Sequence, residues 1–103
     1  MKNPDTVAEA VDILLNKLSK KDMKKIKKMP HEDIMLLHHG LGTYIRNEFG
    51  LWQGNKALAE DCWRIEKTKD DEALDLEIFL KIPDEASSVI IEALWERLQE
   101  KDL

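Results

Sequence analysis

The chain has 103 residues and a formal net charge of −5, with 43% hydrophobic and 36% charged residues. This length allows one hydrophobic core, so we expect a single helical domain over residues 1–103, and the composition excludes an intrinsically disordered chain. A single cysteine, Cys62, excludes an intrachain disulfide and a zinc cluster of several thiolates, and no apolar run approaches the roughly 18 residues that cross a bilayer. These features predict a soluble, cytoplasmic protein without a membrane segment, in which Cys62 is a small buried hydrophobe.

Charge changes sign along the chain. Residues 1–30 carry eight lysines and four acids, whereas residues 31–103 carry eight basic residues and 17 acids. A phosphate-binding surface usually adds arginine and aromatic side chains to its lysines, and the basic run has neither. We therefore predict a solvated helix face rather than a nucleic-acid site. The lysines of this run are Lys17, Lys20, Lys21, Lys24, Lys25, Lys27 and Lys28.

Two short amphipathic helices are predicted before Pro30. Thr6 and Glu9 have capping-box spacing, so the first helix should begin at Thr6. Ser19 and Asp22 form a similar pair that opens a second helix, and Pro30 ends it. The apolar residues of the two helices recur at helical spacing and are expected in the core: Val7, Ala10, Val11, Leu14, Leu15, Leu18, Met23, Ile26 and Met29.

A longer central helix is predicted from His31 to Phe49. Gly40 and Gly42 interrupt it, and each costs about 0.8–1 kcal/mol relative to alanine in a helix interior. Three explanations fit such a cost: another helix crosses closely, a backbone or a ligand approaches, or the helix breaks in two between Gly40 and Thr43. The expected apolar face comprises Ile34, Leu37, Leu41, Tyr44, Ile45 and Phe49.

The segment after this helix contains a connector and two further predicted elements. Gly50 should end the central helix, and Trp52 lies in the connector, where we expect it to be buried. Asn55 can cap the next helix. Within residues 68–82, apolar side chains occupy every second position from Leu74 to Ile82, as in a half-buried strand. A lone strand has no partner, so we favour a helix there.

The last helix should begin with Asp84 as its cap and continue to about Glu100. Its apolar stripe contains Val89, Ile91, Leu94, Trp95 and Leu98. The whole pattern predicts an all-α bundle of five or six short helices, with the Gly40–Phe49 segment central and the C-terminal helix packed across it. A single short strand within residues 74–82 is the alternative.

One polar row forms the candidate site. His38, Gly42 and Arg46 are spaced i, i+4 and i+8, so on a continuous helix they share one face, with the bare backbone of Gly42 between two polar side chains. The planar guanidinium of Arg46 suits a carboxylate or a phosphate. The structural alternative is that Arg46 pairs with an acid of the C-terminal helix. The expected ligand- or partner-binding residues are His38, His39, Gly42, Arg46, Asn47, Trp52 and Asn55.

Motifs for catalysis, metal binding and phosphate binding are absent from the sequence. The three histidines do not have the i, i+4 spacing of a helical metal pair, and the serines and Cys62 have no neighbouring base and orienting acid. Gly40 and Gly42 lack the preceding strand and following lysine of a phosphate loop. We therefore assign no catalytic residue, metal ligand or cofactor.

Two segments resemble a known family. The run from Gly40 to Trp52 contains Gly-Leu-Gly, Ile-Arg-Asn and Phe-Gly-Leu-Trp, and the run from Pro83 to Leu98 contains Pro-Asp, Ala-Ser and Leu-Trp. This pattern is similar to that of a family of small prokaryotic domains catalogued only as a domain of unknown function. The resemblance implies a shared fold and shared special positions over most of residues 7–98, and it implies no reaction.

We therefore expect a non-enzymatic binding or protein-interaction module that acts on a protein partner or on a second copy of itself. The alternative is a small enzyme or nucleotide- or anion-binding protein, with His38 or His39 as the base and Arg46 as the anion clamp. A third hypothesis, nucleic-acid binding through Lys17–Lys28, predicts an affinity that falls steeply with added salt.

Overall fold

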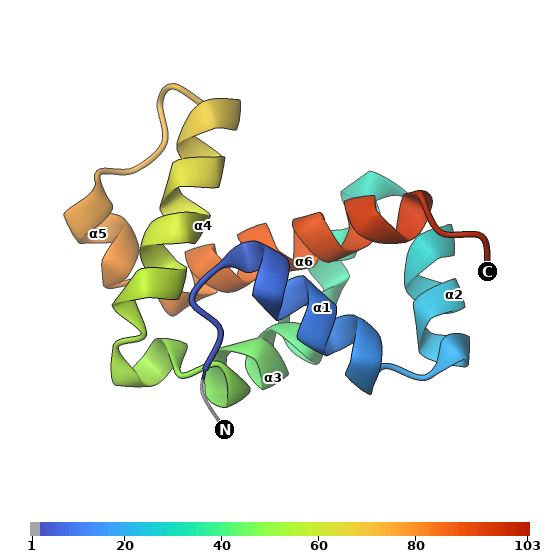
Figure 1. Cartoon of the computed structure of the whole chain (residues 1–103). Helices are drawn as coiled ribbons and strands as arrows, with labels where there is room; N and C mark the ends of the chain where they lie inside the picture. The colour runs from blue at the N-terminus through green and yellow to red at the C-terminus, as the bar shows by residue number, and fades with distance from the viewer. Residues whose placement is uncertain (1–2) are drawn as a thin grey trace.

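Side-chain caps begin the first two helices as the sequence predicts. The computed structural model describes residues 3–103, so the first two residues of the domain predicted over residues 1–103 lie outside the described part (Figure 1). Helix α1, Val7–Lys17, begins where the Thr6 hydroxyl accepts a hydrogen bond from the Glu9 amide at 3.1 Å. Helix α2, Lys20–Lys28, begins with the same bond from the Asp22 amide to Ser19, also at 3.1 Å.

The predicted central helix is divided into two elements. A 3-10 helix, η1, spans His31–His38, and helix α3 spans Leu41–Glu48, with a turn between them. The break lies at His39 and Gly40, so it includes the first residue of the range that the glycines indicated. A 3-10 helix has three residues per turn, so apolar residues spaced for an α-helix do not share one face, and Ile34 alone is buried in η1.

Glycine ends α3 and opens the following connector. Gly50 has a φ of 71°, the left-handed conformation that glycine adopts without strain, and it precedes the short 3-10 helix η2, Leu51–Gln53. Trp52 is 57% exposed, so the prediction that it is buried is wrong; Leu51 fills the core at this point instead. Helix α4, Lys56–Lys69, then begins at Asn55, whose side chain accepts from the Leu58 amide.

No strand forms in residues 74–82, so the strand alternative is wrong. This segment contains helix α5, Leu76–Leu80, which packs against α4 and the last helix through the buried side chain of Phe79. Helix α6, Pro83–Gln99, follows directly. Its start also differs from the prediction: Pro83 occupies the first turn and Ile82 precedes it, so Asp84 lies inside the helix instead of capping it.

The part of the chain that the structure describes contains six α-helices and two 3-10 helices. The predicted count of five or six was slightly low because the His31–Phe49 segment divides and a short 3-10 helix forms in the connector. The fold class, all-helical and compact, is confirmed by a radius of gyration of 13.0 Å. Every helix in residues 3–103 is too short or too polar to span a membrane.

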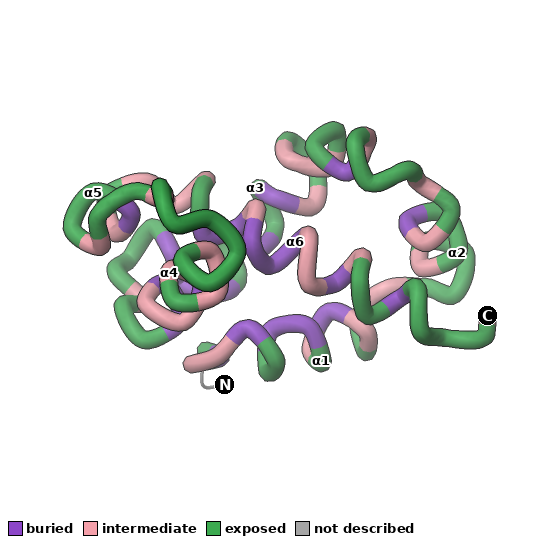
Figure 2. The backbone as a smooth tube through the Cα atoms, turned by 90° about the horizontal axis from the view of Figure 1, so that it is seen from above, coloured by how far each residue is buried: buried purple, intermediate pink, exposed green. Residues whose placement is uncertain are grey.

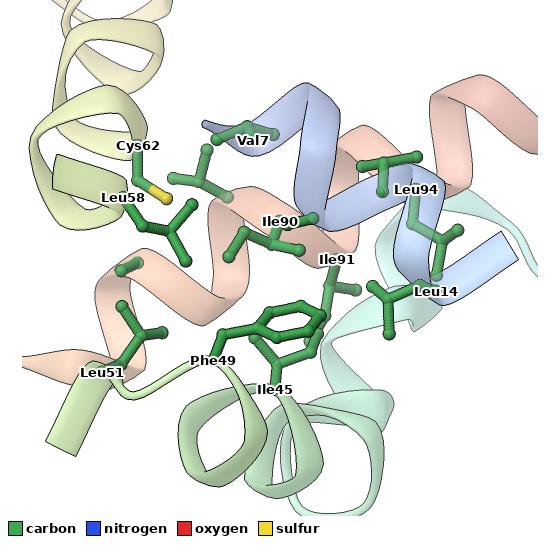
Figure 3. Close-up of a cluster of buried hydrophobic side chains, with 14 of the residues drawn as sticks. Val7, Leu14, Ile45, Phe49, Leu51, Leu58, Cys62, Ile90, Ile91 and Leu94 are labelled. Carbon is green, nitrogen blue, oxygen red and sulfur yellow. The ribbon is translucent and has the colours of Figure 1, made fainter. Parts of the chain in front are cut away.

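Helix α6 is the centre of the fold, a role that the sequence assigned to the Gly40–Phe49 segment. It contacts all the other helices, and buried residues concentrate along it and along the facing side of α1 (Figure 2). Such extensive burial explains its weak amphipathicity, because neighbours cover several of its sides. Figure 3 shows this core, in which Ile90, Ile91 and Leu94 of α6 meet side chains from α1, α3 and α4. The buried residues of α6 are Ala86, Ser87, Val89, Ile90, Ile91, Leu94 and Leu98.

Cys62 lies in this core, as predicted, with no exposed surface. Burial, together with the negative charge of the adjacent Asp61, raises the pKa of its thiol. Because the thiolate is the reactive form, we expect iodoacetamide to label Cys62 only when the protein opens, so that the labelling rate rises with urea in parallel with unfolding. Rapid stoichiometric labelling of the folded protein would contradict this expectation.

Candidate functional site

Arg46 is the centre of the candidate site, and its guanidinium is bound inside the protein. The side chain is buried, with 6% of its surface exposed. Its Nη1 donates to the hydroxyl of Ser87 on α6 at 2.9 Å, and its Nη2 donates to the Thr43 hydroxyl at 3.1 Å and to the His38 carbonyl oxygen at 3.4 Å. These contacts join η1, α3 and α6.

A carboxylate of α6 neutralises this guanidinium. Oδ1 of Asp84 lies 3.2 Å from Nε of Arg46, close enough for an ion pair, although the N–H direction does not satisfy hydrogen-bond geometry. Oδ2 of Asp84 lies 3.5 Å from Nε2 of His38. Asp84 is itself in the first turn of α6, where a negative charge is favourable. The pairing of Arg46 with an acid of the C-terminal helix is therefore what the structure shows.

Packing within this cluster explains why residue 42 is a glycine. A Cβ atom placed at residue 42 would lie 3.0 Å from Nη1 of Arg46 and 3.6 Å from Cδ1 of Ile91. The first distance is tighter than ordinary van der Waals contact, so glycine leaves room for the guanidinium to lie across the helix. The tight contact at Gly42 comes from the Arg46 side chain of the same helix, which none of the three explanations named, whereas the predicted break is found at Gly40.

Four of the seven candidate residues do not join the Arg46 cluster. The His39 side chain is exposed, with its ring centroid 5.5 Å from that of His38, and its carbonyl oxygen accepts a hydrogen bond from the Thr43 hydroxyl at 2.6 Å. Asn47 is exposed on α3. Trp52 is exposed on η2. Asn55 has a structural role, because its side-chain amide donates to the carbonyl oxygens of Pro4 at 3.0 Å and Phe49 at 2.7 Å.

The structure thus brings together His38, Gly42 and Arg46, but through the turn before α3 rather than along one continuous helix. The sequence did not identify their partners Thr43, Ser87 and Asp84 as members of the cluster. Within residues 3–103, His, Cys, Asp and Glu side chains nowhere group by three or more in an arrangement that could hold a metal ion. The guanidinium of Arg46 is buried and paired, so its role in the structure is to hold η1, α3 and α6 together. Ligand binding by the seven candidate residues stays a prediction.

An open apolar surface lies on the other side of η1 and α3. We call it the α2–α3 groove: a hollow of about 520 Å³ between α2, η1 and α3. Leu36, 74% exposed, and Tyr44, 36% exposed, border it, and Ile26 of α2 is buried beside it. Its other apolar lining residues are Leu18, Met29, Leu37 and Leu41. An exposed apolar surface of this kind is typical of interaction sites.

The sequence does carry one signal for this groove. Residues 34–37 are four consecutive apolar residues, Ile-Met-Leu-Leu, and one face of a helix cannot bury all of them. The structure buries Ile34 and leaves Met35 and Leu36 exposed. The excess of apolar residues could therefore have indicated a surface site.

Lysines flank the groove along α2. This helix carries six lysines and one acid, Asp22. Lys25 and Asp22 both line the groove, and Lys21 and Lys28 lie on the same stripe as Lys25 at helical spacing. The net potential along this wall is positive, because the lysines outnumber the single aspartate.

A second, acidic cavity of about 310 Å³ lies between η1, α4 and α6. It is lined by four glutamates, Glu32, Glu66, Glu85 and Glu92, and by His31, whose Nε2 contacts the Glu92 carboxylate at 2.8 Å. Burial raises the pKa of Glu66, and the negative charges of Glu92, Glu85 and Asp70 add to this effect against the opposing charge of Lys69.

This raised pKa predicts a gain in stability from Glu66→Gln at neutral pH. The folded state holds the Glu66 proton more tightly than the unfolded chain does. The free energy of unfolding therefore falls as the pH rises from the usual glutamate pKa to the raised pKa of Glu66, and it stays at this lower value at higher pH. We expect Glu66→Gln to raise Tm at neutral pH and the gain to vanish below the usual glutamate pKa. Glu72→Gln, in the exposed turn between α4 and α5 and outside the cavity, should leave Tm nearly unchanged, and an equal gain in both variants would contradict the explanation.

The fold and the surface together define a small all-helical domain with a sealed arginine cluster and an open, lysine-flanked apolar groove. The family model described as Domain of unknown function (DUF6794) matches residues 3–62, and the chain belongs to this family. The match includes α1 to α3, the groove and Arg46, but it ends before α5 and α6, so the predicted family resemblance of Pro83–Leu98 stays a prediction. No curated protein matches the chain, and no solved structure matches it.

Proposed function

We propose that this domain is a non-enzymatic protein-interaction module that binds an acidic, amphipathic helix of a partner in the α2–α3 groove. The single observation that carries this proposal is the combination of an open apolar floor with a lysine wall. The proposal includes a cytoplasmic location, which the free thiol of Cys62 supports.

The shape of the groove favours a helix as the occupant. One wall is α2, nine residues long, so it extends about 13 Å at 1.5 Å per residue. Two to three turns of a partner helix match this length, with apolar anchors at i, i+3 or i+4, and i+7. Leu36 and Tyr44 are placed to contact such anchors because they border the groove and remain exposed.

The lysines favour negative charge on the flank of the occupant. Acidic side chains beside the apolar anchors would face Lys21, Lys25 and Lys28, and like charges there would be repelled. The isolated Asp22 provides one opposing charge in the groove lining. The absence of arginine and aromatic side chains from α2 favours a protein over a nucleic acid at this surface.

A selection from a random-peptide display library tests the proposal. We expect peptides selected on the wild-type domain to be acidic and to repeat apolar residues at helical spacing. Leu36→Asp should weaken their binding by at least about tenfold, equivalent to about 1.4 kcal/mol. Met35→Asp is the matched control, because Met35 is the adjacent exposed residue, 64% exposed, and does not line the groove.

The two variants make the outcome decisive. Binding that survives Met35→Asp and is lost in Leu36→Asp supports the groove. Peptides that bind equally to both variants, or that are basic, would contradict the proposal. Lys25→Glu should weaken binding because Lys25 lines the groove. Lys56→Glu should not, because Lys56 is an exposed residue of α4 that does not line the groove.

A further inference from the structure

Helix α5 and the residues before it carry acids beside exposed apolar side chains, the chemistry that the α2–α3 groove is proposed to bind. With five residues, α5 is about half as long as the groove wall formed by α2, so it would fill only part of the groove. Residues 70–80 contain five acids and no lysine, arginine or histidine. Within this segment two large apolar side chains are exposed, Leu74 by 40% and Ile78 by 46%. We propose that α5 of one copy of this chain docks into the α2–α3 groove of a second copy, an inference that rests on the proposed function of the groove.

The packing of α5 leaves its acidic, apolar surface free. Phe79 is 1% exposed and anchors α5 against α4 and α6. Asp75 and Glu77, the neighbours of Leu76 in the sequence, are exposed, and nearly half of the surface of Ile78 is exposed as well. The helix is thus anchored through Phe79, while Asp75, Glu77 and Ile78 stay exposed.

The two complementary surfaces lie at opposite ends of the molecule. Figures 1 and 2 both place α5 at one end and α2 at the other, with α6 between them. A contact between α5 of one copy and the groove of another therefore leaves a free groove at one end of the pair and a free α5 at the other. Such a head-to-tail contact continues beyond the dimer unless it closes into a ring.

The size of the contact predicts weak association. The two exposed apolar residues and the lysine–acid pairs make an interface at the small end of the range for specific complexes, below about 1,200 Å². We expect dissociation constants of about 10 μM to 1 mM, and we expect added salt to weaken the association because exposed charges are screened.

Sedimentation of two complementary variants tests the inference. Leu36→Asp spoils the groove and leaves α5 intact, whereas Ile78→Lys spoils α5 and leaves the groove intact. Both substitutions fall on exposed side chains, so both variants should fold, and circular dichroism checks this. We expect the wild type to grow in mass with concentration beyond a dimer, each variant alone to remain a monomer, and their equimolar mixture to stop at a dimer.

The outcomes separate this inference from the proposed function. A wild type that stays monomeric up to about 1 mM, the upper limit of the expected dissociation constants, would overturn the inference, because a substantial fraction of the chains should be associated at that concentration. A mixture of the two variants that shows no dimer would also overturn it. In either case, acidic helical peptides that still bind in a Leu36-dependent manner would leave the proposed function standing, whereas their failure to bind would remove that function as well.

Discussion

Phe79→Ala is expected to lower the free energy of unfolding by about 3–5 kcal/mol, the largest effect of any single truncation in α5. Phe79 is the buried residue of this five-residue helix, so removing the ring leaves a cavity and also releases the contact between α5 and its neighbours. A domain of this size has a total stability of about 5–15 kcal/mol, so the variant should lose a large part of it. Urea unfolding followed by circular dichroism measures the change.

Ile78→Ala is the control for this prediction. Ile78 precedes Phe79 but is 46% exposed, so its truncation should cost about 0.5–1 kcal/mol at most. Equal losses in the free energy of unfolding in the two variants would show that Phe79 is not the main anchor of α5. They would contradict the description of α5 as a helix held by Phe79 with an exposed acidic surface.

Asp84→Ala is expected to destabilise the protein by about 2 kcal/mol. The substitution leaves the buried guanidinium of Arg46 without its carboxylate partner, and burying an unpaired charge is costly. The value lies below the usual range for breaking a buried pair because half of the Asp84 side chain remains exposed, so water partly screens the interaction.

A double-mutant cycle measures the Arg46–Asp84 interaction itself. Arg46→Met keeps most of the buried volume and removes the charge, so Asp84→Ala in that background should cost only about 0.5 kcal/mol. An Asp84→Ala effect of the same size in both backgrounds would contradict the structural role of Arg46. His38 also contacts Asp84, at 3.5 Å, so all members of the cycle keep His38 and are measured at one fixed pH.

The sequence predicted most of the helices because their boundaries depend on local chemistry. Thr6 and Ser19 cap their helices, Pro30 and Gly50 end theirs, and these contacts span a few residues. The 3-10 conformation of His31–His38 could not be predicted, because its apolar residues also fit an α-helix and the choice depends on packing against α6. Residues 74–82 were ambiguous for the same reason, since burial of Phe79 against two distant helices decides the outcome.

The candidate site was predicted in part. The sequence identified Arg46 and Gly42 as special positions and named pairing with a C-terminal acid as one alternative. It could not choose between pairing and ligand binding, because Asp84 and Ser87 lie about 40 residues away along the chain and only the fold brings them to Arg46. The exposure of Trp52 was missed because a large aromatic side chain is usually buried, and its neighbour Leu51 occupies the core position.

A partner is proposed to bind in the α2–α3 groove and not at the Arg46 cluster. The most direct test is an NMR titration of the methyl-labelled domain with an acidic, helix-forming peptide obtained in the display selection. We predict that the methyl signals of Leu36, Leu41 and Met29 shift, while those of Leu94 and the Nε–H signal of Arg46 stay in place. Unchanged groove methyl signals, or shifts confined to Arg46 and its neighbours, would contradict the account.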